Sequence, residues 1–182
     1  MTDTTYSAFT PAYTGVARAL HWITAAIVIT MIVIGISMVR APEGPTQNWL
    51  FELHKSLGVT LIPIVLFRFF YRLTHKPVPL PHDIPLPQRL AAETTHWLLY
   101  ALLLIQPFLG WIGTSAYPAP VTLFGLQLPP IWPEDHAFSE RVLAVHRLTG
   151  LAIAALVCAH VAGALFHHFI RKDTVLLRMM RG

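Results

Sequence analysis

The chain has few charged residues and a single cysteine. Asp, Glu, Lys and Arg make up only 12% of its 182 residues, against about 25% in an average globular domain, and 54% of the residues are hydrophobic. This composition excludes an ordinary soluble domain. The single cysteine, Cys158, excludes an internal disulfide and the attachment of a c-type haem through a pair of cysteines.

Four apolar runs contain most of the hydrophobic residues. They cover residues 19–39, 53–73, 94–113 and 142–170. A helix crosses a bilayer with about 20 consecutive apolar residues, so each run is long enough to span one. We therefore expect an all-α fold, in which residues 1–182 form one integral membrane domain. This domain would be a bundle of four transmembrane helices in a lipid bilayer.

The positive residues are divided unequally between the two sides of such a bundle. The side with both termini would hold Arg18, Arg68, Arg72, Lys76, Arg89, Arg171, Lys172, Arg178 and Arg181. The other side would hold only Arg40, Lys55, Arg141 and Arg147. Because Lys and Arg are enriched in cytoplasmic loops, we expect both termini in the cytoplasm. The net charge of +4 is then a feature of membrane topology, and we expect no nucleic-acid partner.

Two strings share one pattern: His54-Lys-Ser-Leu-Gly58 and His146-Arg-Leu-Thr-Gly150. Histidines within a membrane helix are costly and usually mark a functional site. A glycine four residues later leaves a gap on the same helix face, which a flat ligand could occupy. The adjacent cation, Lys55 or Arg147, would neutralise an acidic group at the edge of that ligand. A haem b ligated by His54 and His146, with its propionates at the membrane surface, meets these requirements.

A second level of ligands is indicated by a spacing of 14 residues. His160 follows His146 by 14 residues, which in a helix returns to within about 40° of the same face and advances by about 21 Å. Two ligands placed in this way can serve two stacked haems. Arg68 follows His54 by the same interval and would pair with a propionate of the second haem.

The first and third apolar runs carry a complementary pattern. Each opens with a His-Trp pair, at His21 and His96, and has a glycine 14 residues later, at Gly35 and Gly110. Small residues at that depth would leave room for the first haem.

The residues alone leave the ligands of the second haem open. His21, His96 and His160 lie at comparable depth, and any two of them could flank it. His167 shares a helix face with His160 but lies about 10 Å nearer the cytoplasm. Together with His168, it suits a quinone or propionate site at the membrane surface.

Longer strings extend the pattern over the whole chain: RALHWITAAIVI, FELHKSLGVTL, HWLLYALLLIQPFLGW, LFGLQLP, AVHRLTG and CAHVAGALFHHFIRKDTVLLRMM. Through them the chain resembles the bacterial cytochrome b561 family, whose members include a superoxide:ubiquinone oxidoreductase. The last string and the two H-[KR]-x-x-G strings are the most specific. The same four-helix, di-haem plan is similar to that of the cytochrome b subunits of nickel–iron hydrogenases and formate dehydrogenases.

This resemblance implies two non-covalent haem b groups in a multi-pass protein of the bacterial inner membrane. The ligands would be His54 and His146 on the periplasmic side and His21 and His160 on the cytoplasmic side. His96 would lie beside the cytoplasmic haem or the quinone. Iron with two histidine ligands has no open position and is suited to electron transfer. The implied reaction is oxidation of superoxide at the periplasmic face and reduction of ubiquinone near the cytoplasmic face.

Lys55 and Arg147 would then either attract the superoxide anion or hold haem propionates. Two other functions stay open on the sequence alone. The chain could be a cytochrome b subunit that links a periplasmic dehydrogenase or hydrogenase to the quinone pool, with the proline-rich loop over residues 115–140 docking that partner. It could also be a cofactor-free, histidine-lined transporter of protons or metal ions.

Overall fold

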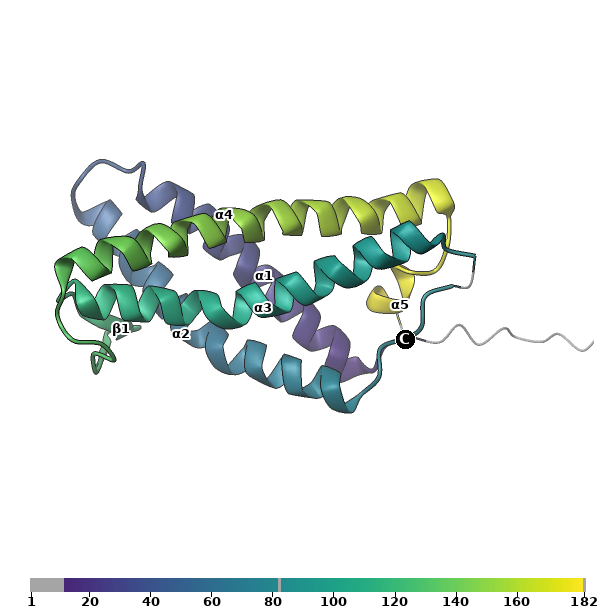
Figure 1. Cartoon of the computed structure of the whole chain (residues 1–182), viewed down its shortest axis with the longest axis horizontal. Helices are drawn as coiled ribbons and strands as arrows, with labels where there is room; N and C mark the ends of the chain where they lie inside the picture. The colour runs from purple at the N-terminus through teal and green to yellow at the C-terminus, as the bar shows by residue number, and fades with distance from the viewer. Residues whose placement is uncertain (1–11, 82, 182) are drawn as a thin grey trace, which may run out of the picture.

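The computed structural model describes residues 12–81 and 83–181, which form a bundle of long helices (Figure 1). These are α1 (Gly15–Met38), α2 (Pro45–Thr74), α3 (Leu86–Ala116) and α4 (His136–Phe166). Each of them, with α4 continued to Arg171, is long and apolar enough to cross a membrane. The expected all-α membrane bundle is therefore confirmed. The helices extend several residues beyond most of the predicted apolar runs.

The helices begin where the sequence offers capping groups. The Thr14 side chain accepts a hydrogen bond from the Ala17 amide at the start of α1, over 3.2 Å. The Asp135 carboxylate does the same for the Phe138 amide at the start of α4, over 2.9 Å. Proline stands in the first turn of α2 and of α3, where a missing N–H costs no helical hydrogen bond. These caps fix the positions at which the four helices enter the bundle.

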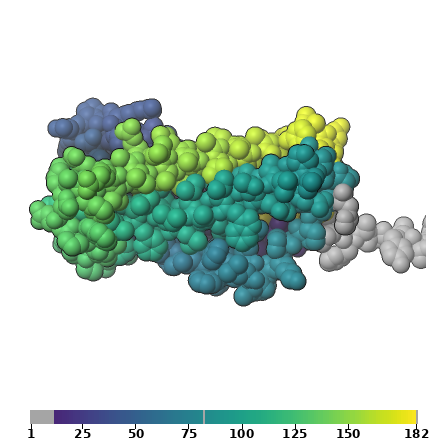
Figure 2. Space-filling view, viewed as in Figure 1, coloured from purple at the N-terminus to yellow at the C-terminus, as the bar shows by residue number. Residues whose placement is uncertain are grey.

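The helices pack in two antiparallel pairs. α1 packs on α2 and α3 packs most extensively on α4, while α2 and α3 join the two pairs. In Figure 2, α3 and α4 lie in front, with part of α2 visible below α3. The backbones of α1 and α4 make few close approaches. Contacts between α1 and α4 are therefore made chiefly by side chains.

A layer of aliphatic side chains fills the middle of the bundle. Val28, Leu61, Val65 and Ile153 are its buried core. Val28, Leu61 and Ile153 each follow a histidine of their own helix by seven residues, or about 10 Å along the axis. The core therefore lies between two levels of histidines, one toward each end of the bundle.

A small β-hairpin that the sequence analysis did not predict lies at one end, here named the hairpin end. It consists of β1 (Val121–Leu123) and β2 (Leu126–Leu128), paired in antiparallel fashion. Its two-residue turn, Phe124 and Gly125, has positive φ at both positions (49° and 92°), as such tight turns require. β1 packs against α2, so the hairpin lies against the helix that carries His54.

The opposite end, here named the C-terminal end, is formed by the chain after α4. A π-helical segment, η1 (His167–Arg171), leads to Lys172 in the left-handed conformation, and the chain then turns back to α5 (Leu177–Met180). The Trp22 indole donates to the Met179 carbonyl over 3.1 Å. α5 is thereby held beside the beginning of α1 (Figure 1).

Candidate functional site

The hairpin end holds a pair of histidines from two helices. The rings of His54 (α2) and His146 (α4) have centres 6.1 Å apart and planes at 81°. Two imidazoles that ligate one metal from opposite sides, with metal–nitrogen bonds of about 2 Å, have ring centres about 6 Å apart. The separation of this hairpin-end pair thus suits a single metal between the rings.

Two glycines make room for these rings. A Cβ at Gly35 would lie 3.3 Å from Cε1 of His54, and a Cβ at Gly110 would lie 3.1 Å from Cε1 of His146. The depth predicted for the two glycines agrees with the structure. Their immediate neighbours are the imidazoles themselves.

The two rings of the hairpin-end pair differ in their hydrogen bonds. His146 Nδ1 lies 3.1 Å from the Gln106 carbonyl oxygen, and because a carbonyl only accepts, Nδ1 carries the proton. The lone pair of His146 is therefore on Nε2. Both ring nitrogens of His54 are buried without a hydrogen-bond partner in the described part of the chain. Buried polar atoms without partners are rare, and on a histidine they fit a missing ligand bond.

The C-terminal end holds three histidines, here named the C-terminal cluster. The ring centre of His160 (α4) lies 6.0 Å from that of His21 (α1) and 5.2 Å from that of His96 (α3). Arg68 Nη2 donates to His21 Nδ1 over 2.9 Å, and Arg68 Nε donates to the Tyr100 hydroxyl over 3.2 Å. Arg68 thus lies at the level that the 14-residue spacing predicts.

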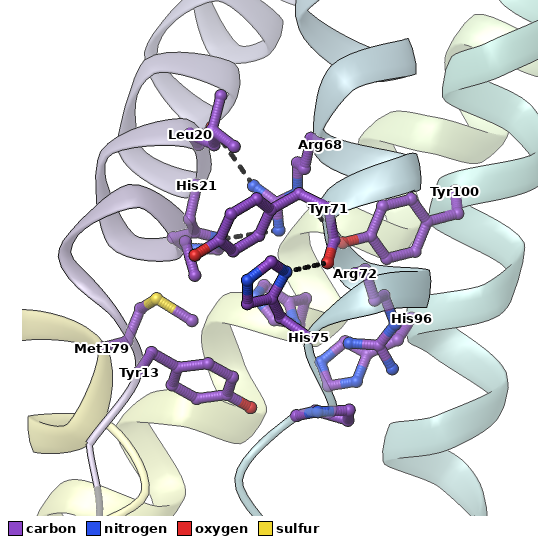
Figure 3. Close-up of a pocket in the computed structure, with 13 residues that line it drawn as sticks. Tyr13, Leu20, His21, Arg68, Tyr71, Arg72, His75, His96, Tyr100 and Met179 are labelled. Atoms are coloured by element: carbon purple, nitrogen blue, oxygen red, sulfur yellow. Dashed lines mark hydrogen bonds between the residues drawn. The ribbon is translucent and has the colours of Figure 1, made fainter.

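A pocket opens beside this cluster, with about 620 Å³ of space free of atoms when its open side is included. Figure 3 shows the arginines, histidines and tyrosines that surround it. The guanidinium of Arg72 lies over the rings of Trp97 and Tyr100, at 5.4 and 5.3 Å from their centres. Among the described residues, the lining contains Arg68 and Arg72 but no carboxylate. Such a pocket suits a ligand that brings its own negative charge.

Comparison with known proteins shows which family this chain belongs to. The model of the prokaryotic cytochrome b561 family matches residues 12–182. The chain belongs to this family. It is 34% identical to "Cytochrome b561 homolog 2" of Escherichia coli, over 92% of this chain and 90% of that protein. It is 30% identical to "Cytochrome b562" of Cereibacter sphaeroides (94% and 96%) and 26% identical to "Probable superoxide oxidase CybB" of Yersinia pestis (92% and 95%).

The protein is therefore a membrane cytochrome b of an electron-transfer family, for which haem b is the expected cofactor. Its residues fit that group at both levels. The hairpin end supplies two rings at the separation for a doubly ligated iron and a histidine with two unpartnered nitrogens. The C-terminal end supplies further imidazoles and two arginines for the acidic edge of a haem.

The two motif cations have different surroundings. Lys55 forms an ion pair with Glu52 and donates to the Pro120 carbonyl over 2.8 Å, so its charge is balanced and tied to the loop before β1. Arg147 is exposed and forms no ion pair or hydrogen bond within the residues described here. Of the two motif cations, only Arg147 presents an uncompensated charge to the solvent.

The two motif glycines also have different neighbours. A Cβ at Gly58 would lie 3.6 Å from the terminal methyl of Met31, an ordinary contact. A Cβ at Gly150 would lie 3.1 Å from the side-chain nitrogen of Gln106. The gap predicted for a flat ligand at Gly150 is therefore occupied by an amide from α3. The sequence analysis did not single out Gln106.

His167 and His168 lie outside the pocket lining. His167 Nδ1 lies 2.5 Å from Asp173 Oδ2, and Arg171 links this hydrogen-bonded pair to Asp83 over 2.6 Å. Burial acts to raise the pKa of the Asp173 carboxyl, but the hydrogen bonds from His167, the Val175 amide and Arg171 hold it below its usual value. His168 contacts the ring of Phe169. The hydrogen bond between His167 and Asp173 fastens the turn that leads to α5.

Proposed function

We propose that this cytochrome b carries two haem b groups, oxidises superoxide at the hairpin end and reduces ubiquinone at the C-terminal end. Two superoxide anions lose one electron each and leave as oxygen, and one ubiquinone takes up both electrons and two protons to become ubiquinol. When bound, each haem supplies a one-electron redox centre without an open iron position. The 26% identity to a probable superoxide oxidase supports this choice of substrate.

The observation that carries the proposal is the presence of two imidazole pairs at nearly equal ring separations, 6.1 and 6.0 Å, on the two sides of the aliphatic core. We assign His54 and His146 as ligands of one haem. For the other we assign His21 and His160, with His96 beside that haem or the quinone. Arg68 would then release His21 Nδ1 and pair with an acidic group of the cofactor.

The division of positive charge sets the orientation. Arg18, Arg72 and Lys76 lie toward the C-terminal end, together with the cations of residues 171–181. By the positive-inside preference, this end faces the cytoplasm and the hairpin end faces the periplasm. Both termini are then cytoplasmic, and the protein lies in the inner membrane with transmembrane segments within α1, α2, α3 and α4.

At the hairpin end, Arg147 is the better candidate to attract superoxide. Its charge is exposed and unpaired within the described chain, whereas that of Lys55 is balanced by Glu52. An exposed cation near the entry point raises the encounter rate with an anion. At the C-terminal end, we assign the pocket beside His96, whose described lining has two arginines and no carboxylate, to part of a cofactor or a quinone head group. His167 and His168 remain candidates for its outer rim.

The experiment is a turnover assay on purified protein in detergent. Superoxide is generated enzymatically, and ubiquinol formation from a short-chain ubiquinone is recorded together with the haem spectrum. We expect superoxide to reduce the haem, and ubiquinol to form at one molecule for every two superoxide anions consumed. Haem that is not reduced by superoxide would refute the proposal.

One observation favours a second candidate, a subunit that accepts electrons from a periplasmic dehydrogenase or hydrogenase. The loop at the hairpin end exposes apolar side chains, with 67% of Phe124 and 64% of Leu126 accessible, and Ile131 and Trp132 are also exposed. Under this function a larger redox protein co-purifies with the chain, and the isolated chain does not react with superoxide. A cofactor-free transporter would lack haem absorption bands altogether, which family membership argues against.

A further inference from the structure

Gln106 forms an unusually complete set of contacts with the segment that carries His146. Its side-chain nitrogen donates to the His146 carbonyl over 2.8 Å, and its side-chain oxygen accepts from the Thr149 hydroxyl over 2.5 Å. Its own backbone carbonyl accepts from His146 Nδ1 over 3.1 Å. One residue of α3 thus holds both the ring of His146 and the helical turn after it.

The local sequence of both helices permits this arrangement. Gly110 lies one turn after Gln106 and leaves the space through which the His146 ring reaches the α3 backbone. Gly150 lies one turn after His146 and leaves the space that the Gln106 amide fills. A side chain at either glycine would meet the His146 ring or the Gln106 amide at 3.1 Å, closer than an ordinary contact.

The partner histidine has none of these supports. His54 forms no hydrogen bond through either ring nitrogen in the described residues, and the equivalent glycine, Gly58, faces only the flexible side chain of Met31. The two H-[KR]-x-x-G strings are therefore alike in sequence but different in what surrounds them.

We infer that Gln106 is a positioning residue of the hairpin-end site: it fixes the ring and the protonated nitrogen of His146, and Gly150 serves to admit the Gln106 side chain. This inference rests on the proposed ligation of a haem by His146, but not on the identity of the electron donor. A ligating imidazole that donates its other N–H to a carbonyl is a more basic ligand, which favours the oxidised iron. His146 is thereby preset for ligation, while the described residues offer the ring nitrogens of His54 no hydrogen bond.

The test compares Gly150→Ala and Gln106→Leu with the wild type. Redox titration and low-temperature electron paramagnetic resonance follow the hairpin-end haem, which is identified as the signal missing in His54→Ala. Gln106→Leu keeps the backbone carbonyl that accepts from His146 Nδ1, but it removes the side chain that holds the turn after His146, so this hydrogen bond should loosen. We therefore expect Gly150→Ala and Gln106→Leu to raise the midpoint potential of the hairpin-end haem and shift its resonance. That haem should also pass to a competing apoprotein about 10- to 100-fold more readily, because loss of other groups that orient metal ligands lowers metal affinity by this factor.

Several controls make the outcome decisive. Ile105→Leu alters a half-exposed neighbour of Gln106 and should shift neither the midpoint potential nor the resonance of the hairpin-end haem. The signal from the C-terminal end in the same sample reports whether the variant is folded. If a variant loses the signals of both haems, Thr149→Val is used in its place. This change removes the hydroxyl that donates to the Gln106 amide, and we expect it to shift the midpoint potential in the same direction by a smaller amount. Shifts in Ile105→Leu equal to those in Gly150→Ala, or no shift in Thr149→Val and Gln106→Leu, would overturn the inference. If these shifts are observed but superoxide is not oxidised, only the proposed substrate is refuted.

Discussion

The two histidine levels differ in how far the chain prepares them for a metal. At the hairpin end, His146 already donates through Nδ1 to a backbone carbonyl, and the described residues offer no partner to either ring nitrogen of His54. At the C-terminal end, Arg68 donates to Nδ1 of His21, and a third histidine, His96, lies closer to His160 (5.2 Å between ring centres) than His21 does (6.0 Å). At one level a neutral carbonyl holds one of the two rings, whereas at the other a charged guanidinium does.

The surroundings of the two levels also differ: a loop covers one level, and a pocket opens beside the other. The hairpin end is covered by a loop that is tied to α2 by the Ser56 hydroxyl, which donates to the Thr122 carbonyl and accepts from the Phe124 amide. The C-terminal end has an open pocket whose described lining has two arginines and no carboxylate. Under the proposed function, a small anion would exchange an electron at the first end and a quinone head group would bind at the second. The comparison shows that one repeated histidine pattern can have different neighbours at its two levels.

The largest effect is expected from Arg68→Leu, which acts only on the C-terminal end. Arg68 contacts both His21 and Tyr100 and would pair with an acidic cofactor group. Loss of such a group typically costs about 10- to 100-fold in metal-site affinity or activity. We expect ubiquinol formation to fall by that factor, while haem reduction by superoxide at the hairpin end stays within about twofold of wild type in stopped-flow traces. Equal losses at both ends would show that the levels are not separable in this way.

Ser56→Ala should act only on the hairpin end. The Ser56 side chain is buried and forms two of the hydrogen bonds that hold the β-hairpin on α2, at 3.2 and 2.9 Å, beside the one that the Thr122 hydroxyl donates to Glu52. Removing it leaves a partly buried amide and carbonyl without these partners, which costs about 1 kcal/mol of stability. We expect faster proteolysis of the β-hairpin and a lower melting temperature. Ser37→Ala, which removes only a bond within α1, is the matched control and should change stability by less than about 0.5 kcal/mol.

A smaller effect separates the two motif cations. Arg147→Gln should slow haem reduction by superoxide about twofold to fivefold at low salt, because it removes an unpaired exposed charge. Lys55→Gln should change this rate less, since Glu52 already balances Lys55. Ionic strength should slow the wild type and Lys55→Gln but have little effect on Arg147→Gln. A stronger effect of Lys55→Gln would mean that the Glu52 pair opens in solution.

The smallest effect concerns the turn at the C-terminal end. The hydrogen bonds from His167, the Val175 amide and Arg171 hold the pKa of Asp173 below its usual value, so the ionised carboxylate stabilises the fold above the unfolded pKa of about 4. That stabilisation is lost as the pH falls through the folded pKa. Asp173→Asn should therefore cost about 1 kcal/mol at pH 7, and the difference from wild type should shrink below pH 4 in thermal unfolding. A difference that is independent of pH would exclude this role for the charge.

Much of the architecture could be predicted from the sequence because it depends on length and period. Runs of about 20 apolar residues predict membrane helices, and a 14-residue spacing keeps two side chains on one face whatever the helix packs against. This is why the levels of His54 with Gly35, of His146 with Gly110 and of Arg68 with His21 agree with the structure.

The remaining features depend on contacts between segments distant in the sequence. Whether Gly150 faces a cofactor or the amide of Gln106 is set by the rotation of α3 against α4, which periodicity within one helix does not fix. The β-hairpin within the proline-rich loop could not be predicted because each strand has only three residues. The pairing of Lys55 with Glu52 is a local i, i+3 contact and could have been suspected from the spacing alone.

The most direct test of two histidine-held haems is the ratio of haem to protein in purified wild type, His54→Ala, His160→Ala and His96→Ala, each checked for folding by circular dichroism. The proposal predicts two haems per chain in wild type, one each in His54→Ala and His160→Ala, and two in His96→Ala. Loss of a haem in His96→Ala, with both haems retained in a His21→Ala variant, would show that the ligand is His96 of α3 and not His21 of α1. Folded wild-type protein without haem would contradict the account as a whole.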